Sequence, residues 1–341
     1  MEERRSIAPG FEPVAAAFED GFFAASIDGE LVVDLGEDDE LVLIFSGTKG
    51  LVAICLLALI ERGRLRLDEP VATYWPEFSQ ADVLVRHVVS HTAGLPGLVP
   101  APELEELLDA ERMEQRIAAQ PPFWPAGERL AYHALTYGWL CGGLVRRIDG
   151  RTIGRFFADE IAAPLGLELW IGLPPALEPR VAELVRAPDY GVIFAGDDRS
   201  LLEAQYGPLL TDFPWNEPAF HTSEIPAANA IGTARSIALL YGRLDRILGP
   251  RTLTLGRTEL SRGVCAITGF PYAFGVGFEL QTELGTLGPP VGAFGHTGSG
   301  GSAHGAWPEE RVGFSYAPTE LRSFDGDERA RRLLAALHAC L

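Results

Sequence analysis

Cysteine is scarce in this chain, and its spacing excludes two common kinds of site. The 341 residues include four cysteines, which form no C-x-x-C pair. Zinc knots and thioredoxin-like redox sites require cysteines at that spacing, so we expect neither. Cys55 and Cys141 lie within apolar helical patterns, and we expect both to pack in the core without forming disulfides.

Long apolar segments are also missing. The N-terminal stretch, MEERRSIAPG, is charged and contains no apolar run of the about 7 to 15 residues found in a secretory signal. The longest apolar run, residues 51–60, has about half of the roughly 20 residues that a membrane-spanning helix needs. We therefore expect a cytoplasmic protein without a membrane span, in which residues 51–60 form a buried helix.

Positive charge and cofactor motifs are in short supply. The chain has 28 Lys and Arg against 47 Asp and Glu, a net charge of -19, so we expect no nucleic-acid and no membrane partner. The H-E-x-x-H zinc motif is absent, and the glycines of residues 295–301 are not followed by the helical pattern that a dinucleotide-binding turn needs. We expect no metal, no organic cofactor and a small-molecule ester or amide as substrate; the oligomeric state stays open.

Strand-like patterns occupy both ends of the chain. Residues 21–27 and 31–35 are apolar runs joined by Asp28-Gly29, a dipeptide that suits a tight hairpin turn because glycine accepts positive φ. The C-terminal part adds three strand-like runs and two helical patterns, at residues 272–280, 291–295, 311–317, 234–248 and 328–339.

The middle of the chain has a different pattern. Between about residues 65 and 230, short helical segments such as 103–119 and 136–148 are broken by proline and glycine. Residues 172–226 show little periodicity, which makes them a candidate substrate lid. We predict an α/β (α+β) fold: a three-layer α/β/α sandwich around a central antiparallel sheet, with an inserted helical domain. The sheet domain would comprise residues 1–65 and 231–341, the helical domain residues 66–230, and the active site would lie in the cleft between them.

Ser46 and Lys49 carry the strongest chemical signal. An apolar stretch, residues 41–45, runs into Ser46, and the predicted buried helix follows, so S-x-x-K places both side chains on one face at a helix start. Serine is a weak nucleophile until a base takes its proton, and a lysine can do this when apolar surroundings lower its pKa from about 10.4. The helix N-terminus would stabilise an oxyanion. Taken alone, the motif also fits a helix-capping serine beside an exposed lysine.

Three further motifs follow S-x-x-K. Residues 90–95 read SHTAGL, residues 124–127 read WPAG shortly before Tyr132-His133-Ala134, and residues 294–301 read FGHTGSGG. In this order they resemble the motifs of the β-lactamase-like serine hydrolases, which include penicillin-binding proteins, class C β-lactamases and class VIII-type carboxylesterases. The resemblance covers nearly the whole chain.

The resemblance implies a role for each motif. Ser46 would be the acylated nucleophile, Lys49 its base, and Tyr132 a proton relay beside the lysine, with Tyr137 as the competing tyrosine. The backbone N–H groups of Ser46 and Ser299 would form the oxyanion hole. The oxyanion and substrate-binding positions on the late strand would be His296, Thr297, Gly298 and Ser299.

Two positions depart from the family pattern, and one histidine needs a separate interpretation. Ala134 stands where the family has asparagine, so the amide that contacts a substrate's acylamino group is missing. His296 replaces a more familiar lysine; it could bind a substrate carboxylate or carbonyl, or be a strand histidine with a satisfied partner. We interpret His91 as part of a structural turn.

Ester hydrolysis is the activity least harmed by Ala134, because neither nucleophile nor base lies at that position. Three alternatives would use the same serine: a D-amino-acid peptidase or amidase, a weak β-lactamase, and an acyltransferase. Outside the class of enzymes, the chain could be a penicillin-binding sensor or a non-catalytic scaffold, because a fold does not guarantee catalysis.

Overall fold

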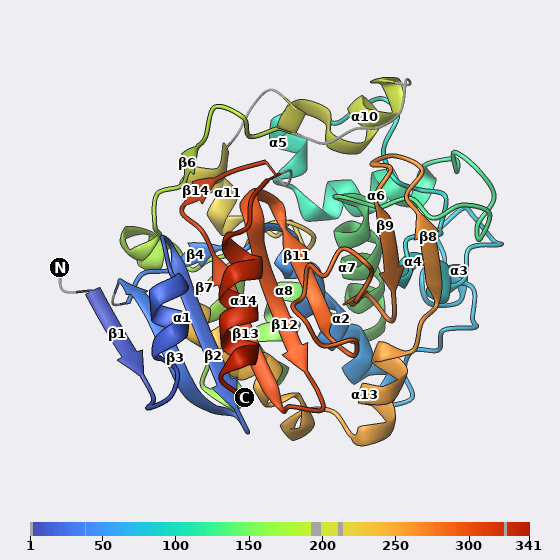
Figure 1. Cartoon of the computed structure of the whole chain (residues 1–341). Coiled ribbons are helices and arrows are strands. Elements are labelled where there is room, and N and C mark those ends of the chain that lie inside the picture. The colour runs from blue at the N-terminus through green and yellow to red at the C-terminus, as the bar shows by residue number, and fades with distance from the viewer. Residues whose placement is uncertain (1–2, 38, 192–198, 211–213, 324–325) are drawn as a thin grey trace.

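The computed structural model describes residues 3–37, 39–191, 199–210, 214–323 and 326–341. Its largest unit is a nine-stranded antiparallel sheet in the order β1-β3-β2-β13-β12-β11-β10-β9-β8 (Figure 1). Strands from both ends of the chain therefore lie side by side. They are β1 Glu3–Ile7, β2 Phe22–Ile27, β3 Glu30–Glu37, β8 Ser261–Val264, β9 Pro271–Phe274, β10 Glu279–Leu280, β11 Phe294–Gly298, β12 Ser302–Trp307 and β13 Val312–Ala317.

Helices cover both faces of this sheet, which confirms the predicted three-layer arrangement. On one face, α1 (Glu12–Ala17) and α14 (Arg329–Ala339) pack over alternate residues of β13, including Phe314 and Tyr316. On the other face, α12 (Ala234–Gly242) comes so close to β13 that a Cβ at Gly313 would lie 2.2 Å from the carbonyl oxygen of Ala238.

The middle of the chain is mainly helical, with α5 and α10 at the top of the view and α3, α4 and α6 at its right (Figure 1). A small sheet, β4 (Val42–Leu43), β7 (Ala230–Gly232) and β5 (Leu169–Ile171), and a parallel pair, β6 (Val185–Arg186) with β14 (Glu320–Leu321), accompany it. The boundaries near residues 65 and 231 stay a prediction. The α-helices of this middle region are α3 Val71–Tyr74, α4 Val85–Val89, α5 Leu104–Leu107, α6 Ala110–Ala119, α7 Thr136–Asp149, α8 Ile153–Phe157, α9 Ala163–Leu165, α10 Arg199–Tyr206 and α11 Pro218–Thr222, whereas α13 Pro250–Arg257 follows α12 in the C-terminal part.

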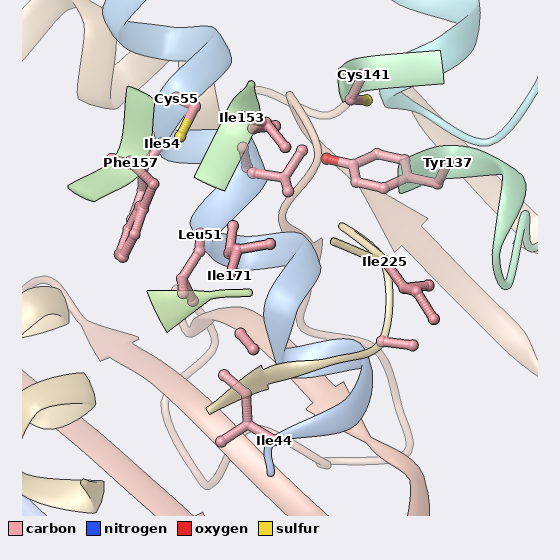
Figure 2. Close-up of a cluster of buried hydrophobic side chains, with 14 of the residues drawn as sticks. Ile44, Leu51, Ile54, Cys55, Tyr137, Cys141, Ile153, Phe157, Ile171 and Ile225 are labelled. Atoms are coloured by element: carbon pink, nitrogen blue, oxygen red, sulfur yellow. The ribbon is translucent and has the colours of Figure 1, made fainter. Parts of the chain in front are cut away.

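Helix α2 (Thr48–Glu61) forms the centre of the core, and every residue from Thr48 to Leu59 is buried. A helix that is apolar on all sides is stable only inside a protein. Figure 2 shows Cys55 of α2 and Cys141 of α7 within this cluster of apolar side chains. Across the described ranges, no helix combines the length and the apolar character that crossing a membrane requires.

The sequence predicts several elements well and places others incorrectly. The hairpin turn is confirmed, since Asp28 and Gly29 both have positive φ, 55° and 74°. The single strand expected over residues 272–280 is broken into β9 and β10. At the break, Gly277 has φ 78°, and a Cβ there would lie 2.2 Å from Tyr137 Oη.

Three further boundaries need correction. The helix expected over residues 234–248 ends at Gly242, where a Cβ would lie 2.3 Å from Ser26 Oγ, so the close contact with the sheet requires glycine. The run at residues 291–295 becomes a strand only from Phe294, and Val291 is exposed. Strand β12 has the sequence SAHGAW and consists largely of small residues. Because it has no apolar pattern, the sequence did not predict it.

A buried arginine joins the two ends of the chain to the turn after β11. Arg329, which is 1% exposed, donates to both carboxylate oxygens of Asp20, at 3.1 and 2.9 Å. It also donates to both carboxylate oxygens of Asp327, at 2.9 and 2.7 Å, and to the carbonyl oxygen of Gly300 at 3.1 Å. Because the partners are buried or half-buried, loss of the guanidinium would leave a buried carboxylate unpaired.

We predict that Arg329→Met lowers the free energy of unfolding by about 3 to 5 kcal/mol, measured by urea denaturation. The matched control is Arg331→Met on the same helix. Arg331 pairs with Glu328 at 3.1 Å, but both side chains are 41% exposed or more, so its loss should cost about 0 to 1 kcal/mol. Equal losses in the two variants would contradict the structural importance of Arg329.

Candidate active site

Ser46 lies in a short helical turn, Phe45–Gly47, between β4 and α2. Phe45 has φ 48°, a conformation that non-glycine residues adopt only when their surroundings enforce it. The Thr48 hydroxyl supplies such a constraint, because it donates to the Phe45 carbonyl at 2.6 Å and accepts from the Ala230 N–H at 2.9 Å. The turn is thus fixed to β7, and Ser46 is held at the mouth of α2 as the sequence predicts.

The amine of Lys49 is fully buried beside Ser46. Nζ lies 3.0 Å from Ser46 Oγ and donates to the carbonyl oxygens of Ala134 and Ala227, both at 2.8 Å. Burial lowers the pKa of Lys49 well below its ordinary value, and the opposing effects of Cys141 and Glu279 are smaller. In the neutral amine, the two N–H bonds point to the two carbonyls, so the lone pair faces the Ser46 hydroxyl.

Tyr132 lines the same pocket as Ser46. Its ring centroid lies 4.8 Å from Lys49 Nζ. Burial raises the pKa of Tyr132 well above its ordinary value, so the group remains a phenol that can donate a proton. The competing Tyr137 points into the core (Figure 2), where its hydroxyl donates to the backbone carbonyl of Lys49 at 3.4 Å.

His91 lies behind Tyr132 and holds the backbone on both sides of it. The carbonyl oxygen of His91 accepts from the Ala131 N–H, and its Nδ1 accepts from the His133 N–H, both at 3.0 Å. The N–H of Tyr132 itself donates to Cys265 Sγ at 3.2 Å. These contacts agree with a structural role for His91.

Strand β11 and the turn after it form the opposite wall of a pocket that His296, Thr297, Gly298 and Ser299 all line. The His296 imidazole is neutral at ordinary pH, because burial lowers its pKa to about 3, and Nδ1 lies 2.6 Å from the Thr297 carbonyl oxygen. A Cβ at Gly298 would lie 2.7 Å from the Ile44 carbonyl oxygen, so glycine allows this wall to approach the Ser46 turn. The role of each residue in binding stays a prediction.

The rest of the lining is largely apolar. Ala134 lines the pocket, and its carbonyl oxygen accepts from Lys49 Nζ. The segment proposed as a lid contributes Tyr190, whose hydroxyl lies 2.5 Å from Ser299 Oγ. Residues 192–198 and 211–213 of that segment lie outside the described residues, and lid closure stays a prediction. Aromatic side chains in the lining include Tyr132, Tyr190, Tyr206, Trp215, Phe270 and Tyr272.

Glu279 is a pocket residue that sequence reasoning missed. It is buried, and Oε2 accepts from the Thr297 N–H at 3.0 Å and from the Thr297 hydroxyl at 2.7 Å. The sequence signal that could have identified Glu279 is its position as an isolated acidic residue within the apolar run of residues 272–280. Among the residues that the structure describes, no group of three or more His, Cys, Asp or Glu side chains is placed to hold a metal ion.

Comparison with known proteins relates this arrangement to one family. The sequence profile described as "Beta-lactamase" matches residues 12–338. The chain is 35% identical over 348 residues to the esterase/beta-lactamase LipL of Mycobacterium tuberculosis, covering 90% of this chain and 78% of that protein. Over shorter lengths it is 29% identical to the esterase EstB of Burkholderia gladioli, across 151 residues and 38% of each chain.

Solved structures give the same result. A penicillin-binding protein homologue from Caulobacter crescentus superimposes with a TM-score of 0.91 at 32% identity, over 100% of both chains. A family VIII carboxylesterase superimposes with a TM-score of 0.89 at 30% identity, again over 100% of both chains. Similarity of this extent covers the whole described fold as well as the pocket.

We predict that a fluorophosphonate labels Ser46, as measured by intact mass and peptide mapping. Lys49→Met should slow labelling at least about a hundredfold, because the serine would lose its general base. Ser46→Ala should remove the label, whereas Ser299→Ala, which removes another hydroxyl of the same pocket, should retain it on Ser46. A label on Ser299, or a wild-type rate in Lys49→Met, would contradict these assignments.

The labelling rate should rise with pH and reach a plateau. Lys49 accepts a proton only when it is neutral, and burial lowers its pKa, so the rising limb should lie well below the ordinary lysine value of about 10.4. Stopped labelling reactions between pH 5 and pH 10 would measure this. A labelling rate that still rises without a plateau at pH 10 would show that Lys49 is not the base.

Proposed function

The chain belongs to the β-lactamase family, and we propose that it is a serine hydrolase that cleaves small carboxylic esters through an acyl intermediate on Ser46. The observation that carries this proposal is the contact of Ser46 with a buried amine: Ser46 Oγ lies 3.0 Å from Lys49 Nζ, and the ring of Tyr132, which lines the same pocket, has its centroid 4.8 Å from that nitrogen. A nucleophile with an adjacent base and an adjacent acid is what acyl transfer requires. The aromatic lining of the pocket suits an uncharged organic substrate.

The first half of the proposed reaction forms the acyl-enzyme. The neutral amine of Lys49 takes the Ser46 proton as Oγ attacks the ester carbonyl, and the backbone N–H groups of Ser46 and Ser299 receive the negative charge on the carbonyl oxygen. The Tyr132 phenol gives its proton to the departing alkoxide as the C–O bond breaks, and Lys49 returns a proton to Tyr132. One alcohol leaves, and the acyl group remains on Ser46.

The second half regenerates the enzyme. Water takes the place of the alcohol, gives a proton to the Lys49 and Tyr132 pair, and attacks the acyl-Ser46 carbonyl. The returning proton goes to Ser46 Oγ as the acid is released, so no cofactor is consumed and all protons balance. Burial keeps the pKa of Tyr132 high, which suits a group that must be protonated at the start of each half-reaction.

Ala134 directs the proposal to esters rather than amides. Ala134 lines the pocket, and its methyl side chain can neither donate a hydrogen bond to a substrate acylamino group nor accept one from it. Esters without such a group lose nothing, and their better leaving groups need fewer positioning contacts than amides need.

We therefore predict that kcat/KM for p-nitrophenyl butyrate exceeds that for nitrocefin and for a D-alanyl anilide by at least about a hundredfold, or roughly 2.7 kcal/mol in the barrier. Ala134→Asn should narrow the difference. Steady-state kinetics on the three substrates measure it, with Ser46→Ala as the control that should lose all three activities. A preference of the wild-type protein for nitrocefin or the anilide would overturn the ester assignment.

A further inference from the structure

Glu279 places a carboxylate in the pocket wall, close to the residues predicted to bind substrate. It lies on β10, next to β11, and it lines the pocket together with His296 and Thr297. Its Oε2 atom accepts both the N–H and the hydroxyl of Thr297, at 3.0 and 2.7 Å, and Oε1 accepts from the Thr286 hydroxyl at 3.3 Å. Thr297 therefore has both of its donors occupied by a carboxylate that belongs to the protein.

The carboxylate has no cationic partner in ion-pair contact within the described part of the chain. The ring of His296, whose Nδ1 lies 3.7 Å from Oε2, stays neutral because burial lowers its pKa to about 3. Lys49 also acts electrostatically on Glu279, but burial lowers the pKa of its amine well below the ordinary value. Arg322, which also lines the pocket, is paired with Glu320 at 2.8 and 2.5 Å.

We propose that Glu279 is a specificity-determining residue that makes this pocket select esters that are uncharged near the scissile bond and reject esters that carry a carboxylate there. The inference rests on the proposed ester hydrolysis and adds the substrate class. A substrate carboxylate at this end of the pocket would meet a like charge in a buried environment, where repulsion is poorly screened. It would also find the two donors of Thr297 already used.

The groups that face Glu279 determine how this selection depends on pH. They are Lys49 from α2, His296 and Thr297 from β11, Thr286 from the loop after β10, Tyr132 from the segment before α7, Tyr241 from α12 and Tyr272 from β9. Burial raises the pKa values of the three tyrosines, so they remain neutral. Burial also raises the pKa of Glu279 above its ordinary value, while the hydrogen bonds from the two threonines oppose that shift. The rejection of anionic esters should therefore strengthen as pH rises and Glu279 becomes charged.

Two matched ester pairs test the proposal. In one, 4-nitrophenyl hydrogen succinate and its methyl ester differ by a carboxylate on the acyl side; in the other, 3-acetoxybenzoate and its methyl ester differ on the alcohol side. The measured quantity is the ratio of kcat/KM for the neutral ester to that for the charged ester. Because each ratio is taken within one protein sample, it does not depend on how much of a variant is folded.

We expect a ratio of at least about a hundredfold for one of the pairs in the wild-type protein at pH 8, and at least a tenfold smaller ratio in Glu279→Gln. Glutamine keeps an oxygen that can accept from Thr297 and removes the charge. Glu283→Gln is the matched control, since Glu283 is exposed and the variant changes the net charge equally, so its ratio should equal that of the wild type. In the wild-type protein alone, the ratio should increase from pH 5 to pH 8.

The outcomes separate this proposal from the proposed function. If the wild-type protein cleaves both neutral and charged esters equally, or if Glu279→Gln keeps the wild-type ratio, the role of Glu279 is overturned while ester hydrolysis stands. If Glu279→Gln does not fold, the wild-type protein alone decides: a ratio that stays constant or decreases from pH 5 to pH 8 also overturns the role of Glu279. If none of the four esters is cleaved, the proposed function itself fails.

Discussion

The buried amine of Lys49 is the constraint around which the proposed active site is organised. An ammonium ion at that position would have to leave water without an ion-pair partner, which costs several kcal/mol, so the folded protein favours the neutral base. The carbonyls that orient the amine come from Ala134, just before α7, and Ala227, just before β7. Correct placement of one nitrogen thus requires α2, the helical region and the small sheet to be assembled together.

The other parts of the pocket are fixed by similarly buried contacts. Tyr132 is held through its neighbours by His91 and through its own N–H by Cys265. The turn that carries Ser299 is supported from behind by Arg329, which reaches the Gly300 carbonyl from the start of α14. Ser46, Lys49, Tyr132 and the turn that carries Ser299 are therefore each fixed by contacts with other parts of the chain, which is the preorganisation that the proposed catalysis requires.

Local features could be predicted from the sequence, and contacts between distant segments could not. Ser46 and Lys49 are three residues apart, so helical geometry alone places them together. The residues around Tyr132 and Tyr137 in the sequence do not show which tyrosine belongs to the active site. The family motif alone favoured Tyr132, and the structure places Tyr137 within α7, facing the core. Glu279 meets Thr297 through strand pairing, and the Lys49 acceptors are backbone carbonyls, which no side-chain pattern reveals.

Direct titration of Lys49 tests the central claim most directly. Lys49 is the only lysine in the sequence, so protein grown with isotope-labelled lysine gives a single side-chain signal in nuclear magnetic resonance spectra, without assignment. The structure predicts a pKa well below the ordinary value of about 10.4, in the wild-type protein and in Ser46→Ala alike, because burial rather than the serine is the main cause. A titration midpoint at or above about 10.4 would contradict the account.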